Sequence, residues 1–121
     1  MDVLIVDDSA AIRKILRRVL AKTEVPLGEI YEASDGVEAL QLLEHSVVQL
    51  ILCDINMPNM DGIQLLAKVK AKENLRVVPF VMVTTEGSQE RVMQAIDLGA
   101  AGYVKKPFTP EQIKEKLTGI I

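Results

Sequence analysis

The chain has 121 residues, of which 49% are hydrophobic and 26% charged, a balance typical of one globular domain and unlike disordered or fibrous chains. Its net charge of −3 gives no overall cationic field, so we expect no nucleic-acid partner. A single cysteine excludes an intrachain disulfide, and no run approaches the ~18 apolar residues of a membrane span, so we expect a cytoplasmic monomer without membrane contact.

Five short apolar runs, rich in Val, Ile and Leu, predict strands buried on both faces. They cover residues 3–6, 30–33, 50–53, 80–83 and 102–104. Segments with helical spacing of apolar residues separate them. Because a strand, a crossover helix and the next parallel strand join in a right-handed sense, this alternation predicts an α/β fold: a five-stranded parallel sheet with helices on both faces.

The first three predicted helices are amphipathic. The first has apolar residues on one face and basic residues on the other; the apolar positions are Ile12, Ile15, Leu16, Val19 and Leu20. The second begins at an N-cap, Asp35, with an acid at the third helical position, Glu38. Its apolar stripe comprises Val37, Ala39, Leu40 and Leu43. Ile63, Leu66 and Val69 mark the third helix.

The last two predicted helices have clear boundaries. The fourth begins at Ser88, directs Val92, Ala95 and Ile96 inward, and can stop at Gly99 in a left-handed conformation. The fifth combines an N-cap, a proline at the first position and a capping-box glutamine, at Thr109, Pro110 and Gln112. No repeat, low-complexity tract or linker is found, so we expect one domain over residues 1–121 and no output domain.

Polar residues collect at the carboxyl ends of the predicted strands, where open α/β sheets bind ligands. They are Asp7 and Asp8 after the first strand, Asp54 after the third, Thr84 and Thr85 after the fourth, and Lys105 and Lys106 after the fifth. Adjacent acids after a strand can simply complement the next helix N-terminus, and a lysine at a strand end can be a solvated charge. Several carboxylates at one edge, however, need protons or a cation to relieve their repulsion.

Oxygen ligands of this kind suit Mg²⁺, which binds one or two carboxylates together with water and phosphoryl oxygens. A carboxylate can also act as a nucleophile and form an aspartyl-phosphate, while a metal ion and a lysine neutralise the transferred group. Asp54 is the natural acceptor, because it stands alone after the central strand while Asp7 and Asp8 are paired like metal ligands.

These residues lie in motifs that resemble the receiver domains of two-component response regulators, and most closely the single-domain chemotaxis regulators. The motifs are Leu4-Ile5-Val6-Asp7-Asp8, Asp54-Ile55-Asn56-Met57-Pro58-Asn59-Met60-Asp61-Gly62, Val83-Thr84, Gly99-Ala100 and Lys106-Pro107-Phe108. The resemblance covers essentially the whole chain. It implies a flavodoxin-like (βα)5 doubly wound sheet with strand order 2-1-3-4-5.

The resemblance implies a role for each acidic residue. Asp54 matches the phosphoacceptor and is also a residue of the Mg²⁺ site. Asp8 matches a direct Mg²⁺ ligand, and Asp7 an acid that acts largely through water. The backbone carbonyl of Asn56 joins the metal shell, and Lys106 pairs with the acceptor or its phosphoryl group. The family has an apolar residue before this lysine where the chain has Lys105, and its lysine–proline bond is cis, so we expect a cis bond between Lys106 and Pro107.

The resemblance also implies a switch. Thr84 matches the hydroxyl that moves toward the phosphoryl group, and Tyr103 the aromatic ring that turns inward when it does. We expect the target protein, for example a flagellar motor switch, to bind the face made by the fourth helix, fifth strand and fifth helix, bounded by Gln94 and Lys114. Asn56 and Glu86 should flank the path of the hydrolytic water, as in the chemotaxis-type pair. A separate phosphatase is a further possible partner.

The leading hypothesis is thus a signalling switch that catalyses only its own phosphorylation by a histidine kinase or histidine phosphotransfer domain, and its own slow dephosphorylation. A phosphorelay intermediate is the alternative within the family. An aspartate-nucleophile phosphatase is less favoured, because such enzymes have a second acid where this chain has Asn56. A flavin-binding protein is disfavoured because Asp7 and Asp8 stand in place of a hydroxyl- and glycine-rich phosphate loop.

Overall fold

Five parallel strands form one sheet in the order β2-β1-β3-β4-β5, as seen in a computed structural model that describes residues 1–85 and 87–120. The strands are β1 Val3–Val6, β2 Ile30–Ala33, β3 Leu50–Cys53, β4 Phe80–Thr84 and β5 Gly102–Lys105. The helices are α1 Ala10–Lys22, α2 Gly36–Leu43, α3 Gly62–Ala71, α4 Gln89–Asp97 and α5 Pro110–Ile120. The predicted flavodoxin-like strand order is therefore confirmed.

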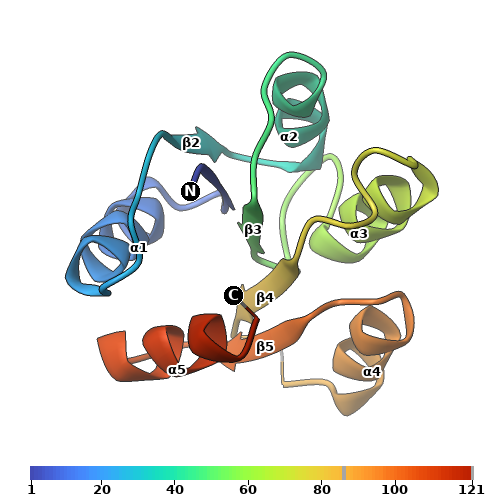
Figure 1. Cartoon of the computed structure of the whole chain (residues 1–121). Helices are drawn as coiled ribbons and strands as arrows, with labels where there is room; N and C mark the ends of the chain where they lie inside the picture. The colour runs from blue at the N-terminus through green and yellow to red at the C-terminus, as the bar shows by residue number, and fades with distance from the viewer. Residues whose placement is uncertain (86, 121) are drawn as a thin grey trace.

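Helices cover both faces of the sheet, α1 and α5 on one side and α2, α3 and α4 on the other (Figure 1). Successive strand residues point to opposite faces, so each strand contributes to both cores. In β1, Val3 and Ile5 pack with the residues of α1 and α5, whereas Leu4 and Val6 pack with those of α2 and α3. Burial on both faces explains why the strands have continuous apolar sequences.

The predicted strand boundaries agree closely with the structure. The first three strands match to the residue, and β4 and β5 each extend one residue further, to Thr84 and Lys105. Thr84 is thus the last residue of a buried strand rather than the first residue of a loop. This difference places its side chain inside the protein, where it is fully buried.

The helix starts follow the expected capping chemistry. Asp35 and Ser88 accept hydrogen bonds from the backbone N–H three residues on. Thr109 and Gln112 exchange the two bonds of a capping box, at 2.8 and 3.2 Å. Gly99 has a φ of +102°, which confirms the left-handed stop after α4. None of the described helices is long and apolar enough to cross a membrane.

Three apolar helix positions were predicted to face inward but are exposed. Ile15, Val37 and Ile96 keep 44%, 41% and 46% of their surface accessible. Each sits at the margin of an apolar stripe, next to a neighbour that occupies the buried centre. A helix of 3.6 residues per turn turns such a marginal position about 100° away from that neighbour, so the residue lies outside the contact with the sheet.

Candidate functional site

Three carboxylates meet at the carboxyl edge of the sheet. β1 and β3 are hydrogen-bonded neighbours with Val6 opposite Cys53, so the residues that follow them leave the sheet side by side. Asp54 N–H donates to the Val6 carbonyl at 2.9 Å. One carboxylate oxygen each of Asp7, Asp8 and Asp54 lies within 4.8 Å of the others, with Asp7 and Asp54 buried and Asp8 exposed. These three residues are called the acidic cluster below.

Lys106 reaches the acidic cluster from the far strand of the sheet. Its Nζ lies 2.7 Å from Asp7 Oδ2 and 3.4 Å from Asp54 Oδ2, and its side chain is 11% exposed. The peptide bond to Pro107 is cis, as expected. Lys105, by contrast, is exposed and lines a groove beside β5. Lys106, which precedes Pro107, is therefore the lysine that contacts Asp7 and Asp54.

The charges in the acidic cluster are only partly balanced. Burial raises the pKa of Asp7, and the nearby Asp54 raises it further, although Lys106 and the backbone N–H of Ser9 oppose this shift. When all three carboxylates are ionised, the Lys106 ammonium leaves an excess of two negative charges. A divalent cation would neutralise this excess. The donors are all hard carboxylate oxygens, which suit Mg²⁺, so the residues present fit that ion.

Asp54 is oriented from both sides. Its Oδ1 accepts a hydrogen bond from the Ile55 N–H at 2.8 Å, while Oδ2 faces Lys106. Its side chain is 10% exposed, which leaves it reachable from the edge of the sheet. This combination of a fixed carboxylate, a nearby ammonium and limited access suits a nucleophile that attacks one bound electrophile.

The remaining predicted site residues differ in solvent exposure. Thr84 is buried at the end of β4, and its carbonyl accepts the Lys106 N–H at 2.9 Å. Tyr103 is half-buried in β5 and packs against the core beneath α2 to α4. Asn56 is exposed in the loop after the acceptor strand. Glu86 lies outside the described residues. The roles assigned to these residues remain predictions.

Gly62 allows α3 to start directly against the acceptor strand. A β carbon at this position would lie 2.1 Å from the backbone oxygen of Asp54, so only glycine fits without displacing the backbone. The Gly62 N–H donates to the Ile55 carbonyl at 2.8 Å. Gly62 thus fixes the backbone that carries the acceptor. The sequence analysis included it in a motif but assigned it no role.

A second contact holds the loop between β3 and α3. Asn59 has a φ of 66°, and its side chain donates to Asp35 Oδ2 at 2.7 Å. The Gly36 N–H donates to the Met60 carbonyl at 3.1 Å. The cap of α2 therefore also anchors the acceptor loop. Asparagine tolerates positive φ better than most residues, and this tendency is the sequence signal that could have revealed the contact.

Arg13 lies on the basic face of α1, and its residue type alone predicts no particular role. In the structure its guanidinium donates to the backbone carbonyl of Asp7 at 2.5 Å. The spacing of six residues from Asp7, one turn into the helix, is the only signal of this contact in the sequence.

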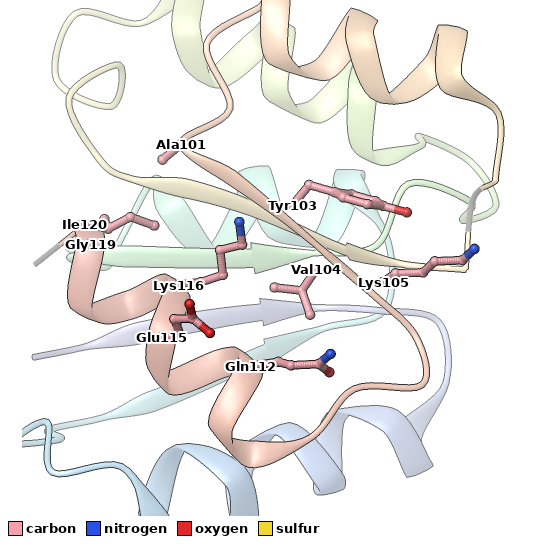
Figure 2. Close-up of a pocket in the computed structure, with 9 residues that line it drawn as sticks. All are labelled: Ala101, Tyr103, Val104, Lys105, Gln112, Glu115, Lys116, Gly119 and Ile120. Carbon is pink, nitrogen blue, oxygen red and sulfur yellow. The ribbon is translucent and has the colours of Figure 1, made fainter.

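A groove of about 510 Å³ lies on the outer side of β5 (Figure 2). It is lined by Ala101, Tyr103, Val104, Lys105, Gln112, Glu115, Lys116, Gly119 and Ile120, and is called the β5–α5 groove below. β5 and α5 line this groove together, whereas none of the described α4 residues lines it, so the target-binding face made by α4, β5 and α5 remains a prediction. Lys114, named above as a boundary of that face, does not line the groove, and its Nζ lies 3.9 Å from Glu24, beside the loop between α1 and β2. Lys114 is two residues from both Gln112 and Lys116, so it projects from a different side of the helix.

The family model of the response regulator receiver domain matches residues 3–118. The chain belongs to the response regulator receiver family. A chemotaxis protein CheY homolog of Campylobacter jejuni is 40% identical, covering 100% of this chain and 92% of the relative. The chemotaxis protein CheY1 of Helicobacter pylori is 37% identical, covering 100% of this chain and 97% of the relative. The structure of the chemotaxis response regulator CheY4 of Vibrio cholerae has a TM-score of 0.87 and 33% identity, covering 99% of this chain and 98% of that one.

These similarities identify a CheY-type receiver domain, consistent with two-component signalling and with chemotaxis. The receiver family resemblance inferred from the sequence motifs is therefore confirmed. The acidic cluster lies where the receiver domain's acidic pocket is expected, and its carboxylates could hold a metal ion.

Proposed function

We propose that this receiver domain accepts a phosphoryl group on Asp54 in a Mg²⁺-dependent reaction and, in this state, presents an altered protein-binding surface. One observation carries the proposal: the Asp54 carboxylate is fixed next to two further carboxylates and the Lys106 ammonium at the carboxyl edge of the sheet. A surface charge cluster without this function would gain nothing from burying two acids together, because their mutual repulsion is costly.

The proposed donor is a phosphohistidine on a histidine kinase or a histidine phosphotransfer domain. An Asp54 carboxylate oxygen attacks the phosphorus, the new O–P bond forms, and the N–P bond to the histidine breaks. The imidazole leaves with the bonding electron pair and takes up a proton from solvent. The reaction needs no further protein nucleophile, so catalysis rests on position and charge.

Each residue of the acidic cluster has its own role in metal binding and phosphoryl transfer. Bound Mg²⁺ would supply positive charge that neutralises the transferring phosphoryl oxygens. Asp8, whose carboxylate is exposed, would ligate the ion directly, together with Asp54 and the backbone carbonyl of Asn56. Asp7 is held by Lys106 and Ser9 and would act through water. The Ile55 N–H keeps Asp54 oriented for attack.

The proposed switch connects the acceptor with the β5–α5 groove. Thr84 ends β4 beside the acceptor strand, and Tyr103 lies in β5 and lines the groove. A hydroxyl drawn toward the phosphoryl oxygens would leave space into which the Tyr103 ring can move. The surface made by α4, β5 and α5 then binds its target differently. Asn56 and Glu86 would control the access of the water that ends the signal.

The relatives favour a chemotaxis role, since both curated relatives are named chemotaxis proteins. We propose a cytoplasmic monomer whose target is a protein such as a flagellar motor switch. A phosphorelay intermediate would instead pass the phosphoryl group to a second histidine. Phosphate-dependent binding of a target protein and onward phosphoryl transfer distinguish the two roles.

The proposal can be tested with a small phosphodonor. The purified chain is incubated with acetyl phosphate and Mg²⁺, and its intact mass is followed with time. Wild type should gain one phosphoryl group, while Asp54→Asn and wild type in excess chelator should gain none. Asp8→Ala should lose both Mg²⁺ binding and phosphorylation. Full-rate phosphorylation of the chelated protein would contradict the proposal.

A further inference from the structure

Arg13 connects the acidic cluster with the edge of the sheet. Its guanidinium donates from Nη1 to the Asp7 carbonyl at 2.5 Å and from Nε to Glu32 Oε1 at 2.8 Å. The side chains of Arg13 and Glu32 are 17% and 31% exposed, so the bond to the Asp7 carbonyl is partly buried whereas the bond to Glu32 lies at the surface. One planar group in α1 thus joins the end of β1 to the edge strand β2.

Glu32 is held by two arginines. Arg17 donates from Nε to the second carboxylate oxygen of Glu32 and from Nη2 to the Ile30 carbonyl, the latter at 2.7 Å. Although partial burial raises the pKa of Glu32, Arg17 and Arg13 outweigh it and hold the pKa below its usual value. Glu32 is therefore ionised at neutral pH. It fixes the guanidinium of Arg13 in one orientation.

The bond from Arg13 acts on the peptide that joins two cluster residues. The Asp7 N–H donates to the Ala33 carbonyl at 3.1 Å, and the two carboxylate oxygens of Asp7 accept from Ser9 and Lys106. Arg13 holds the fourth polar atom, the carbonyl oxygen. This carbonyl belongs to the peptide plane between Asp7 and Asp8. A fixed plane sets the positions of the Asp8 N and Cα atoms, from which the Asp8 side chain leaves the backbone.

We infer that Arg13, oriented by Glu32, is a positioning residue for the metal-binding carboxylates of the acidic cluster. Glu32 has two effects. It neutralises the Arg13 charge, and it keeps the guanidinium on the backbone carbonyl instead of on the cluster carboxylates, where it would compete with a cation. Among the described residues, the hydrogen bonds of Arg13 go to Glu32 and to the Asp7 carbonyl, so it acts through the Asp7–Asp8 peptide. The inference rests on the proposed Mg²⁺ function.

The test is a calorimetric Mg²⁺ titration of the full chain and three variants, Arg13→Gln, Glu32→Gln and the double variant. Mutation of a residue that hydrogen-bonds to a metal ligand commonly weakens metal affinity by about 10- to 100-fold. We expect Arg13→Gln to bind Mg²⁺ about tenfold more weakly than wild type. Glu32→Gln should weaken binding by a smaller factor. Because Glu32 acts only through Arg13, it should have no further effect once Arg13 is replaced.

Arg17→Gln is the matched control. Arg17 also pairs with Glu32, but its other bond goes to Ile30 and not to the acidic cluster. Arg13 alone still holds Glu32 in this variant, so we expect a smaller loss of Mg²⁺ affinity than in Glu32→Gln. Thermal unfolding of each variant without metal confirms that titrations are made well below the melting temperature. If the Mg²⁺ affinity of every variant, Arg17→Gln included, fell in proportion to its melting temperature, Arg13 would have a merely structural role and the inference would be wrong.

The remaining outcomes separate the two proposals. If wild type binds Mg²⁺ and is phosphorylated, but Arg13→Gln binds the ion equally well, the inference alone is wrong. If the two single effects add in the double variant, Glu32 does not act through Arg13 and its assigned role is wrong. If wild type itself binds no Mg²⁺, the proposed function fails and the inference fails with it.

Discussion

The acidic cluster and the β5–α5 groove differ in how their side chains are held. The cluster joins residues that follow β1 and β3, with Lys106 beside them after β5, and described hydrogen bonds fix Asp7 at four polar atoms. The groove is built from two neighbouring elements, and most of its polar side chains are exposed. Phosphoryl chemistry needs rigid placement, whereas a binding surface can be tuned by single exposed residues. The predictions below test this contrast.

The two adjacent lysines give the largest expected difference. Lys106→Met removes the ammonium beside the Asp7 and Asp54 carboxylates, and loss of one such electrostatic group commonly costs about 10²–10³ in rate. Lys105→Met changes only the groove and should leave the phosphorylation rate unchanged. Rates with acetyl phosphate and saturating Mg²⁺ measure both. Equal losses in the two variants would remove the distinction between the regions.

Thr84→Ala tests the proposed coupling between phosphorylation at the acidic cluster and the conformation of the β5–α5 groove. A two-state switch from 1:99 to 99:1 needs ~5.5 kcal/mol, while one hydrogen bond to a charged group supplies roughly 1.5–3 kcal/mol. The variant should therefore still be phosphorylated but show a reduced, incomplete response in the groove. NMR shifts of β5 and α5 residues, before and after phosphorylation, measure this response. A full wild-type response would contradict the proposed coupling.

Two glycines provide a matched comparison of stability. A β carbon at Gly62 would meet the Asp54 backbone, and overpacking of this kind typically costs about 1–3 kcal/mol. At Gly119, in the α5 part of the groove, an added β carbon meets nothing within 4 Å. Gly119→Ala should be neutral or stabilising by up to about 1 kcal/mol, since alanine favours helix. Denaturant unfolding of both variants gives the two values, and similar costs would contradict the comparison.

Asp7→Asn should stabilise the metal-free protein at neutral pH, on the order of 1 kcal/mol. Burial raises the pKa of Asp7 in the folded state above its unfolded value of 3.8. Its contribution to stability is therefore full below that unfolded value and is lost as pH rises through the folded pKa. The gain from the variant should grow over the same range and level off above it. Urea unfolding at several pH values checks this, and a gain confined to acid pH would have the wrong sign.

Much of the fold follows from local sequence patterns. Continuous apolar strands and capping residues such as Asp35 and Thr109 depend on neighbours in the chain, so the sequence alone located them. The meeting of Asp7, Asp8 and Asp54 was also predictable, because parallel strands place their carboxyl ends at one edge.

Contacts between distant surfaces were not predictable in the same way. Arg13 and Lys14 are both basic residues of the first helix, and only the position of β2 shows that Arg13 meets Glu32. The exposure of Ile15 likewise depends on where the helix touches the sheet. Predicting these contacts and exposures requires the three-dimensional structure, because several helix residues share the same residue type and similar spacing.

The most direct test of the account is to identify the phosphorylated residue itself. Wild type is phosphorylated with acetyl phosphate and Mg²⁺, treated with borohydride to reduce the acyl phosphate to an alcohol, and analysed by tandem mass spectrometry of its peptides. We predict reduction at Asp54, with none at Asp7 or Asp8 and none when Mg²⁺ is chelated. Reduction at another residue, or equal labelling without the ion, would contradict the assignment of Asp54 as the acceptor of a metal-dependent site.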